Sequence, residues 1–302
     1  PEVFHPEIFR RVTFRREGKL SWETAAERIN GQKQALCIVN SRKSAQKIYS
    51  LLDPEGAFHL STLMYPAHRK AVLTKIRTRL KDGLPCRVVS TSLIEAGVDV
   101  DFPAVFREEA GLDSILQAAG RCNREGKRPA RESIVTVFQC ETPPPPLFEI
   151  PVAAGRQALN RYDRPDSPEA ICCYFQELLD LKGPEALDQK NILTLMERDY
   201  MPFRKIAERF HLIDSETRTV YIPIGEGEDL VRRLRSGEHG RALFRALGQY
   251  GVSIYPQHFE ALDQAGDLEV LEDGSAALTN LTLYDNDKGL SLTADSGKAL
   301  FI

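Results

Sequence analysis

One glutamine and two arginines, Gln117, Arg121 and Arg124, stand at helical spacing late in the first half of the chain. The segment QAAGRCNREG, residues 117–126, follows a predicted helix that Asp113 can cap. If that helix continues, Gln117, Arg121 and Arg124 stand at positions i, i+4 and i+7 and share one face. Guanidinium forks bind phosphate oxygens in pairs, so this face suits a phosphate chain.

The alternative interpretation of this segment is an ordinary solvated basic helix face. Gly120 argues against it, because a glycine inside a helix costs about 1 kcal/mol relative to alanine. A glycine at that position therefore predicts close backbone packing and favours the functional interpretation.

A second segment, STSLIEAGVDVD at residues 90–101, directly follows a predicted strand at 87–90. The hydroxyls of Ser90 and Thr91 can bind backbone phosphates, or they can cap the helix that follows. Gly97 begins a stretch that is either a plain turn or a site that sets Asp99 against a ribose hydroxyl and Asp101 against a basic partner. Ligands of parallel sheets gather at the carboxyl ends of the strands, so we expect both segments to face that edge.

The elements that must position these segments alternate between strands and helices. Short apolar runs predict strands, and apolar residues at helical spacing between them predict helices. This alternation predicts an α/β fold with a doubly wound parallel sheet. The predicted strands are 7–16, 35–39, 58–62, 87–90, 102–106 and 133–139, and the predicted helices between them include 21–30, 41–52 and 66–81.

Further basic and hydroxyl residues follow other predicted strands. Ser41 and Arg42 follow the strand at 35–39, where they meet nucleic acid or Ser41 simply caps the next helix. The predicted helix 66–81 carries six basic residues, Arg69 among them, which face solvent or track a phosphate backbone. We expect His68 to make a capping or backbone contact rather than to bind a metal, and we predict no metal site.

Residues 90–101 and 117–126 together resemble motifs V and VI of superfamily 2 nucleic-acid helicases. The residues of these two segments are most similar to those of the helicase–nuclease of type I CRISPR systems, whose last motif looks like Gln-x-x-Gly-Arg-x-Asn-Arg-x-Gly. The segments around 40–52 and LSTLMYPAHR at 60–69 also resemble that family, and LYD-x-x-x-GL at 283–290 is similar to its type I-C form.

The resemblance implies a RecA-like lobe and a role for each matching residue. Ser90 and Thr91 would grip DNA, Gly97 and Asp99 would lie by the nucleotide, and Gln117 would face the triphosphate. Arg121 and Arg124 would act as arginine fingers. The implied ligands and partners are ATP with Mg²⁺, single-stranded DNA moved 3′ to 5′, an N-terminal nuclease and first lobe, and an RNA-guided surveillance complex.

Several motifs of a complete motor do not occur in the sequence. It has no Gly-x-x-x-x-Gly-Lys-[Ser/Thr] loop, no Asp-Glu box and no His-Asp pair. The chain is therefore expected to be half a motor, inactive alone and possessing a truncated start at Pro1. Two alternatives stay open, which are half of another superfamily 2 helicase acting on RNA or repair DNA, and a non-catalytic binding or regulatory module.

Composition sets the remaining expectations. The 302 residues suggest two domains, and we predict the RecA-like lobe at 1–140, a proline-rich linker at 141–151 and a smaller, mostly helical accessory domain at 152–302. The accessory domain is expected to include a helix at 185–198 and a hairpin that turns at 285–289. Residues 1–150 carry 23 Lys and Arg against 18 Asp and Glu, so the half with the motifs is the basic one. Six scattered cysteines and the lack of a long apolar run predict a cytoplasmic protein without a membrane span.

Overall fold

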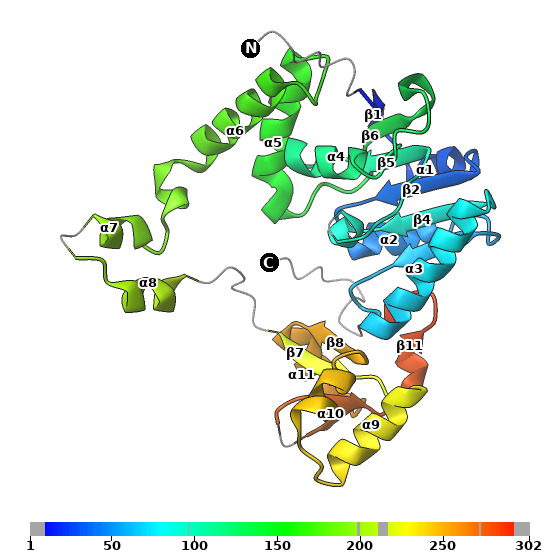
Figure 1. Ribbon diagram of the computed structural model, residues 1–302, viewed down its shortest axis with the longest axis vertical. Coiled ribbons are helices and arrows are strands. Elements are labelled where there is room, and N and C mark those ends of the chain that lie inside the picture. Colours follow the sequence, from blue (N-terminus) through cyan, green and yellow to red (C-terminus); the bar gives the residue numbers. More distant parts are fainter. Residues whose placement is uncertain (1–9, 96, 198–199, 211–216, 272, 293–302) are drawn as a thin grey trace.

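The computed structural model describes residues 10–292 apart from 96, 198–199, 211–216 and 272. Its largest element is a six-stranded sheet in which every pair is parallel, in the order β1-β6-β5-β2-β4-β3 (Figure 1). The predicted α/β, RecA-like fold is thereby confirmed. The six strands are β1 Thr13–Lys19, β2 Gln34–Ile38, β3 Ala57–Leu60, β4 Cys86–Ser90, β5 Ala104–Glu108 and β6 Ile134–Gln139.

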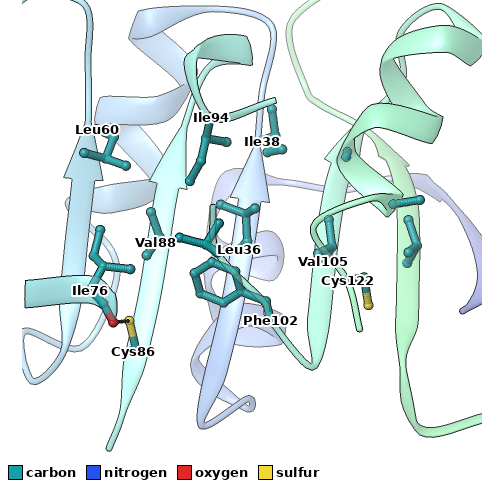
Figure 2. Packing of buried hydrophobic residues seen from close by; sticks show 14 of the residues in the cluster. Leu36, Ile38, Leu60, Ile76, Cys86, Val88, Ile94, Phe102, Val105 and Cys122 are labelled. Carbon is teal, nitrogen blue, oxygen red and sulfur yellow. Dashed lines mark hydrogen bonds between the residues drawn. The ribbon is translucent and has the colours of Figure 1, made fainter. Parts of the chain in front are cut away.

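Helices cover both faces of this sheet. Central strands buried on both sides are typical of a parallel sheet, and all five residues of β2 are buried. On one face α1 and α2 pack around Ile29 and Ile48, and on the other α3 and α4 pack around Ile76 and Phe102 (Figure 2). The helices are α1 Trp22–Asn30, α2 Arg42–Tyr49, α3 Pro66–Lys81 and α4 Leu112–Ala119, with 3₁₀ turns η2 Ser92–Ile94 and η3 Ala130–Glu132.

The helices after the sheet begin earlier than predicted. Pro145 is extended, with φ −53° and ψ 147°, but α5 already starts at Pro146 because proline suits the first turn of a helix. Helices α5 Pro146–Arg161 and α6 Pro168–Lys182 pack on α4 and β6 through Leu112, Val137 and Tyr174. These two helices therefore cover the lobe itself. The elements that follow are η4 Pro184–Leu187, α7 Ile192–Met196 and α8 Phe203–Arg209.

The last part of the described chain contains a second sheet. Four short strands run in the order β8-β7-β10-β9, with β7 parallel to β10 and antiparallel to β8. A mostly helical region was predicted here, and the sheet was missed because strands of three or four residues show no periodicity. The elements are β7 Arg218–Tyr221, α9 Glu226–Arg235, α10 Arg241–Leu247, β8 Gly251–Ile254, α11 Pro256–Gln264, β9 Leu268–Val270 and β10 Ala276–Leu278.

A final hairpin joins this second sheet to the lobe. It consists of η5 Leu281–Leu283, β11 Tyr284–Asp285 and β12 Gly289–Leu290, and it turns at the predicted residues 285–289. Leu290 N–H donates to the carbonyl of Leu63 at 2.9 Å, and Leu63 lies in the same apolar cluster as the second sheet. The loop between β3 and α3 is thus a docking point for the C-terminal unit, beside α3 in Figure 1.

Two other sequence predictions need correction at this level. The first strand was predicted at 7–16, but β1 runs from Thr13 to Lys19, while residues 7–9 lie outside the described part. The helix expected at 185–198 is instead the short η4 and α7 over its described residues. None of the described helices has the length and apolar character needed to cross a membrane.

Candidate nucleotide and nucleic-acid site

The helix that was expected to carry Gln117, Arg121 and Arg124 stops too early to do so. Helix α4 ends at Ala119, and Gly120 is its C-cap with φ −62°. The predicted single helical face is therefore wrong, and Gly120 marks the helix end, where the close backbone packing is with its own helix. A Cβ on Gly120 would meet first the carbonyl oxygen of Gln117, in its own helix.

The start of α4 also differs from the prediction. Gly111 is the N-cap, and Asp113 lies within the first turn, where its carboxylate accepts a hydrogen bond from the Tyr174 hydroxyl at 2.7 Å. The negative charge of Asp113 therefore interacts favourably with the dipole of α4, although Asp113 does not cap the helix. It also ties α4 to α6.

The two motifs meet at an edge that was not predicted. Helix α4 runs back along the sheet, so the residues after it lie at the amino end of β5. There Phe102 forms a parallel bridge with Cys122, and Phe102 N–H donates to the carbonyl of Arg121 at 2.9 Å. Residues 91–101 start at the carboxyl end of β4 and end at this same amino end. The expectation that both motifs share the carboxyl edge is wrong, because one motif crosses the sheet to reach the other.

Asp101 holds the two motifs together. One of its carboxylate oxygens accepts from Arg124 N–H at 2.7 Å and the other pairs with Arg128 at 3.1 Å. The expected basic partner of Asp101 is therefore found inside the chain. The carboxylate is engaged within the chain in this geometry, and the prediction that Asp101 also helps to bind the nucleotide stays a prediction.

Asn123 completes this link and was not predicted from the sequence. It has φ 47°, a left-handed backbone that asparagine tolerates better than most residues. Its fully buried side chain donates to the carbonyls of Arg11 and Arg128 at 2.8 and 2.7 Å. The asparagine in the motif thus shapes the loop, and its sequence signal was that tolerance for positive φ.

Arg124 is the basic group of this site that faces outward. Its Nε lies 2.9 Å from Oδ1 of Asp99, and the two side chains are 42% and 79% exposed. An exposed ion pair of this kind contributes little to stability, typically under about 1 kcal/mol. Asp99 therefore keeps the Arg124 side chain oriented at the surface. A ligand that takes the place of Asp99 loses little free energy in breaking this ion pair. Gln117 is also exposed, two residues before the end of α4.

Arg121, in contrast, points into the protein. It is 8% exposed, its Nε donates to the carbonyl of Ile94 at 3.0 Å, and its Nη2 donates to that of Glu95. Burial lowers the pKa of Arg121, and nearby Arg124 lowers it further. In this arrangement Arg121 braces the end of η2 and the residue after it, and its predicted contact with phosphate stays a prediction.

Gly97 provides the sharp turn in the crossing segment. Its φ is 71°, a conformation that side chains with a Cβ rarely adopt, and nothing lies within 4 Å of where a Cβ would be. Gly97 is exposed beside the outward-facing Asp99. The predicted nucleotide contact at Gly97 stays a prediction.

The residues predicted to bind nucleic acid divide into engaged and accessible groups. Ser90 is fully buried and its hydroxyl donates to the carbonyl of Leu60 at 3.2 Å, and its predicted contact with nucleic acid stays a prediction. Thr91 is partly exposed at the carboxyl end of β4 and makes no side-chain cap to η2. Its nucleic-acid contact therefore stays a prediction.

The loop after β2 shows the capping alternative. The Ser41 Oγ accepts from Ser44 N–H at 3.0 Å and so caps α2. Arg42 is partly exposed in the first turn. Ser41 is structural in this geometry, and a nucleic-acid role for Ser41 or Arg42 stays a prediction.

Arg69 braces the loop before its own helix. Its Nη1 donates to the carbonyls of Met64 and Thr62, and burial lowers its pKa. The side chain is engaged in these contacts, and its predicted contact with nucleic acid stays a prediction. His68 makes a side-chain contact, with Nδ1 2.8 Å from the Tyr284 hydroxyl, and also a hydrogen bond with the backbone of Asn286, as the predicted backbone contact requires.

A buried charged cluster beside these loops was missed entirely. Arg107 on β5 is 1% exposed, and its Nε lies 2.9 Å from Oε1 of Glu95. Its Nη1 donates to Oδ1 of Asn40 at 2.7 Å and to the carbonyl of Glu108 at 2.9 Å. Burial raises the pKa of Glu95, while Arg107 opposes this effect. The only sequence signal was a charged residue in a strand that had to be buried on both faces.

Comparison with known proteins places these motifs in a family. Residues 31–127 match the family described as "CRISPR-associated nuclease/helicase Cas3, C-terminal". The protein named CRISPR-associated nuclease/helicase Cas3 from Haloferax volcanii is 45% identical over 65 residues, which are 22% of this chain and 7% of that protein. The CRISPR-associated helicase Cas3 from Thermoproteus tenax is 26% identical over 148 residues, 49% of this chain and 25% of that protein.

Solved structures extend the likeness in fold to most of the chain. The Cas3–AMPPNP structure from T. fusca has a TM-score of 0.58 at 17% identity and covers 92% of this chain and 42% of that one. A chain in a structure described as a CRISPR RNA-guided surveillance complex before nicking has a TM-score of 0.55 at 17% identity, covering 92% and 44%. The chain thus spans less than half the length of the relatives it matches. Residues 31–127 are thus similar to the C-terminal part of CRISPR-associated nuclease/helicase Cas3, and most of the chain is similar in fold to solved Cas3 structures.

Proposed function

We propose that this chain supplies the second motor lobe of an ATP-dependent DNA helicase or translocase. In this proposal ATP, with Mg²⁺ on its phosphates, binds between this lobe and a first lobe that carries the phosphate-binding loop. The observation that carries the proposal is the exposed Arg124–Asp99 pair, fixed at the point where the two motifs meet.

The geometry supports a role for Arg124 in stabilising phosphoryl charge. The backbone of Arg124 is anchored by Asp101, while its guanidinium is held only by an exposed carboxylate. A triphosphate brought in by a first lobe can replace Asp99 as the partner of Arg124. A positioned arginine that meets charge developing in the transition state is typically worth about 10³–10⁵ in rate.

The nucleic-acid side of the proposal rests on the opposite end of the same segment. Thr91 and Arg42 are the accessible candidates at the carboxyl ends of β4 and β2. We propose that single-stranded DNA binds there and that changes at the nucleotide reach it through residues 91–101. Backbone contacts of this kind carry no base sequence, so RNA binding is an outcome that the test must separate.

The wider assignment follows the named relatives. Cas3 in the surveillance-complex structure suggests that this protein is recruited to an RNA-guided complex in the cytoplasm and works together with a nuclease domain. Translocation 3′ to 5′ and the type I-C form belong to the same proposal. Each depends on the resemblance rather than on a described residue.

The test is Arg124→Ala in a protein that joins this chain to a first lobe. We expect ATP turnover to fall by about 10³-fold or more, with nucleotide binding retained. Arg131→Ala is the control, because Arg131 lies shortly after the motif, on η3, with its side chain 83% exposed. Unchanged turnover in Arg124→Ala would remove this residue from phosphoryl transfer.

A further inference from the structure

We infer that Arg107 is a positioning residue that joins the nucleic-acid end of this lobe to its nucleotide end. The inference rests on the proposed function and adds a residue outside both motifs. Arg107 lies on β5 in the core of the sheet, with its guanidinium at the carboxyl edge.

The contacts of Arg107 reach two separate segments. Toward the nucleic-acid end it donates to Oδ1 of Asn40, the residue directly before Ser41 and Arg42. Toward the crossing segment it pairs with Glu95, which is four residues after Thr91. One buried guanidinium thus fixes the loop after β2 relative to the segment after β4.

The backbone of Glu95 carries the connection onward. The carbonyls of Ile94 and Glu95 accept the two hydrogen bonds of the Arg121 guanidinium. A displacement of Glu95 therefore moves the atoms that hold Arg121, and Arg121 is three residues before Arg124. The resulting chain of contacts runs from Asn40 through Arg107 and Glu95 to Arg121.

Energetics favour a positioning role over a purely stabilising one. Removing two charges from water costs several kcal/mol per ion, and well-packed apolar residues often replace a buried ion pair with no loss of stability. Stability alone therefore gives little reason for Arg107 and Glu95, each less than 10% exposed, to be charged. The Arg107 guanidinium pairs with Glu95 and donates a directional hydrogen bond to Asn40, so it fixes the relative position of three segments, which apolar packing does less sharply.

The experiment replaces the pair by apolar residues of similar length. Glu95→Met/Arg107→Met removes both charges together, so neither is left buried alone. We expect the free energy of unfolding to change little, while the stimulation of ATP turnover by single-stranded DNA falls by about 10-fold or more. The turnover is measured in the protein joined to a first lobe, and unfolding is measured by urea titration.

A second ion pair, between Glu109 directly after β5 and Arg156 on α5, provides the control. Arg156 and Glu109 are 2.7 Å apart and also lie at the carboxyl edge of the lobe, but they contact neither motif. Glu109→Met/Arg156→Met should therefore leave the stimulation by DNA unchanged. If both double variants lose it equally, the effect is general to the edge and the role of Arg107 is overturned.

Hydrogen exchange on this chain alone separates this inference from the proposed function. In Glu95→Met/Arg107→Met the amides of residues 92–99 should exchange about 10-fold faster, while those of β2 and β4 should not change. Normal exchange in that segment, or normal stimulation by DNA, would overturn the positioning role. If DNA does not stimulate ATP turnover even in the unaltered protein, the proposed function fails. The hydrogen-exchange measurement then still decides whether Arg107 positions residues 92–99. If the double variant does not fold, Arg107→Lys, which keeps the charge but loses the fork, takes its place in both measurements.

Discussion

At the scale of single residues, the arginines of this lobe do different work according to what surrounds them. Arg124 is exposed beside Asp99, whereas Arg121 and Arg107 are buried and donate to backbone carbonyls or to a carboxylate. Guanidinium groups have several donors in a fixed fork and can brace a loop as readily as they bind phosphate. Burial therefore divides these arginines into one outward group and two internal braces.

The Asp101 carboxylate gives the first stability prediction at this scale. It accepts from Arg124 N–H and from Arg128, with its side chain 14% exposed. Asp101→Ala leaves a backbone donor and a half-buried guanidinium without this acceptor, so we expect the free energy of unfolding to fall by about 1–3 kcal/mol. Urea titration measures the change.

The control for Asp101 is a carboxylate that does not connect two segments of the chain. Glu132 on η3 is 59% exposed and pairs loosely with its neighbour Arg131 at 3.6 Å. Glu132→Ala should change the free energy of unfolding by less than about 0.5 kcal/mol. Equal effects of the two substitutions would mean that Asp101 does not join the motifs.

The sequence predicted the residue types of the site better than their roles. Thr91, Asp99, Gln117 and Arg124 are accessible where a ligand could reach them, but their contacts with a ligand stay predictions. Arg121 belongs to the same sequence motif as Arg124, yet its side chain is buried. Periodicity treated both arginines as one helical face, and only the end of α4 at Gly120 separates them.

At the scale of elements, the closest joint is between the final hairpin and the loop before α3. Gly289 begins β12 with φ 82°, and a Cβ there would lie 2.5 Å from the carbonyl carbon of Leu63. Tyr284 on β11 stacks on Tyr65, and its hydroxyl accepts from Tyr65 N–H at 3.2 Å. Backbone and ring contacts thus fix the same loop.

We therefore expect Gly289→Ala to loosen this joint. Left-handed backbone costs a residue with a Cβ about 1–2 kcal/mol, and the contact with Leu63 adds to that cost. The free energy of unfolding should fall by more than about 2 kcal/mol in a urea titration. Proteolysis between α6 and β7 should also become faster.

Gly266 is the matched control for the backbone effect. It has φ 77°, but nothing lies within 4 Å of its Cβ position. Gly266→Ala should therefore show only the conformational cost of about 1–2 kcal/mol. The hairpin would not be tightly docked if the two alanine variants were equally stable.

The order of elements was largely readable from the sequence, and the short ones were not. Long apolar runs gave the strands β2, β4 and β6, and Ser21 gave the start of α1. The second sheet consists of strands that pair across long separations, so local pattern holds little information about it. The turn at 285–289 was found because Asp285 and Gly289 provide turn chemistry directly.

At the scale of the whole molecule, a buried histidine makes the contact between lobe and C-terminal unit sensitive to pH. His59 on β3 is 3% exposed, and its Nδ1 lies 3.2 Å from the carbonyl of Asp287. Burial lowers the pKa of His59 from 6.5 to about 4, although the charges of Asp285 and Asp287 oppose this and Lys288 supports it.

The sign of the pH effect follows from proton binding. Between pH 4 and 6.5 the unfolded chain binds a proton at His59 and the folded chain does not, so stability is lost as the pH falls. From pH 7.5 to pH 5 this residue should lower the free energy of unfolding by about 2 kcal/mol. Urea titrations at the two pH values measure the change.

Two variants isolate the contribution of His59. His59→Gln should remove about 2 kcal/mol from the difference between pH 7.5 and pH 5. His239→Gln alters an exposed histidine and should leave that difference as it was. An unchanged difference in His59→Gln would show that this ring does not sense pH.

The central claim is that this lobe completes a motor whose other half lies on a first lobe. The most direct measurement is the rate of ATP hydrolysis with and without single-stranded DNA, for this chain alone and for the chain joined to a first lobe. We predict no turnover for the chain alone and turnover stimulated by single-stranded DNA in the joined protein. A lack of ATP hydrolysis in both proteins would contradict the motor and favour a binding module. Stimulation by RNA alone would contradict DNA as the substrate.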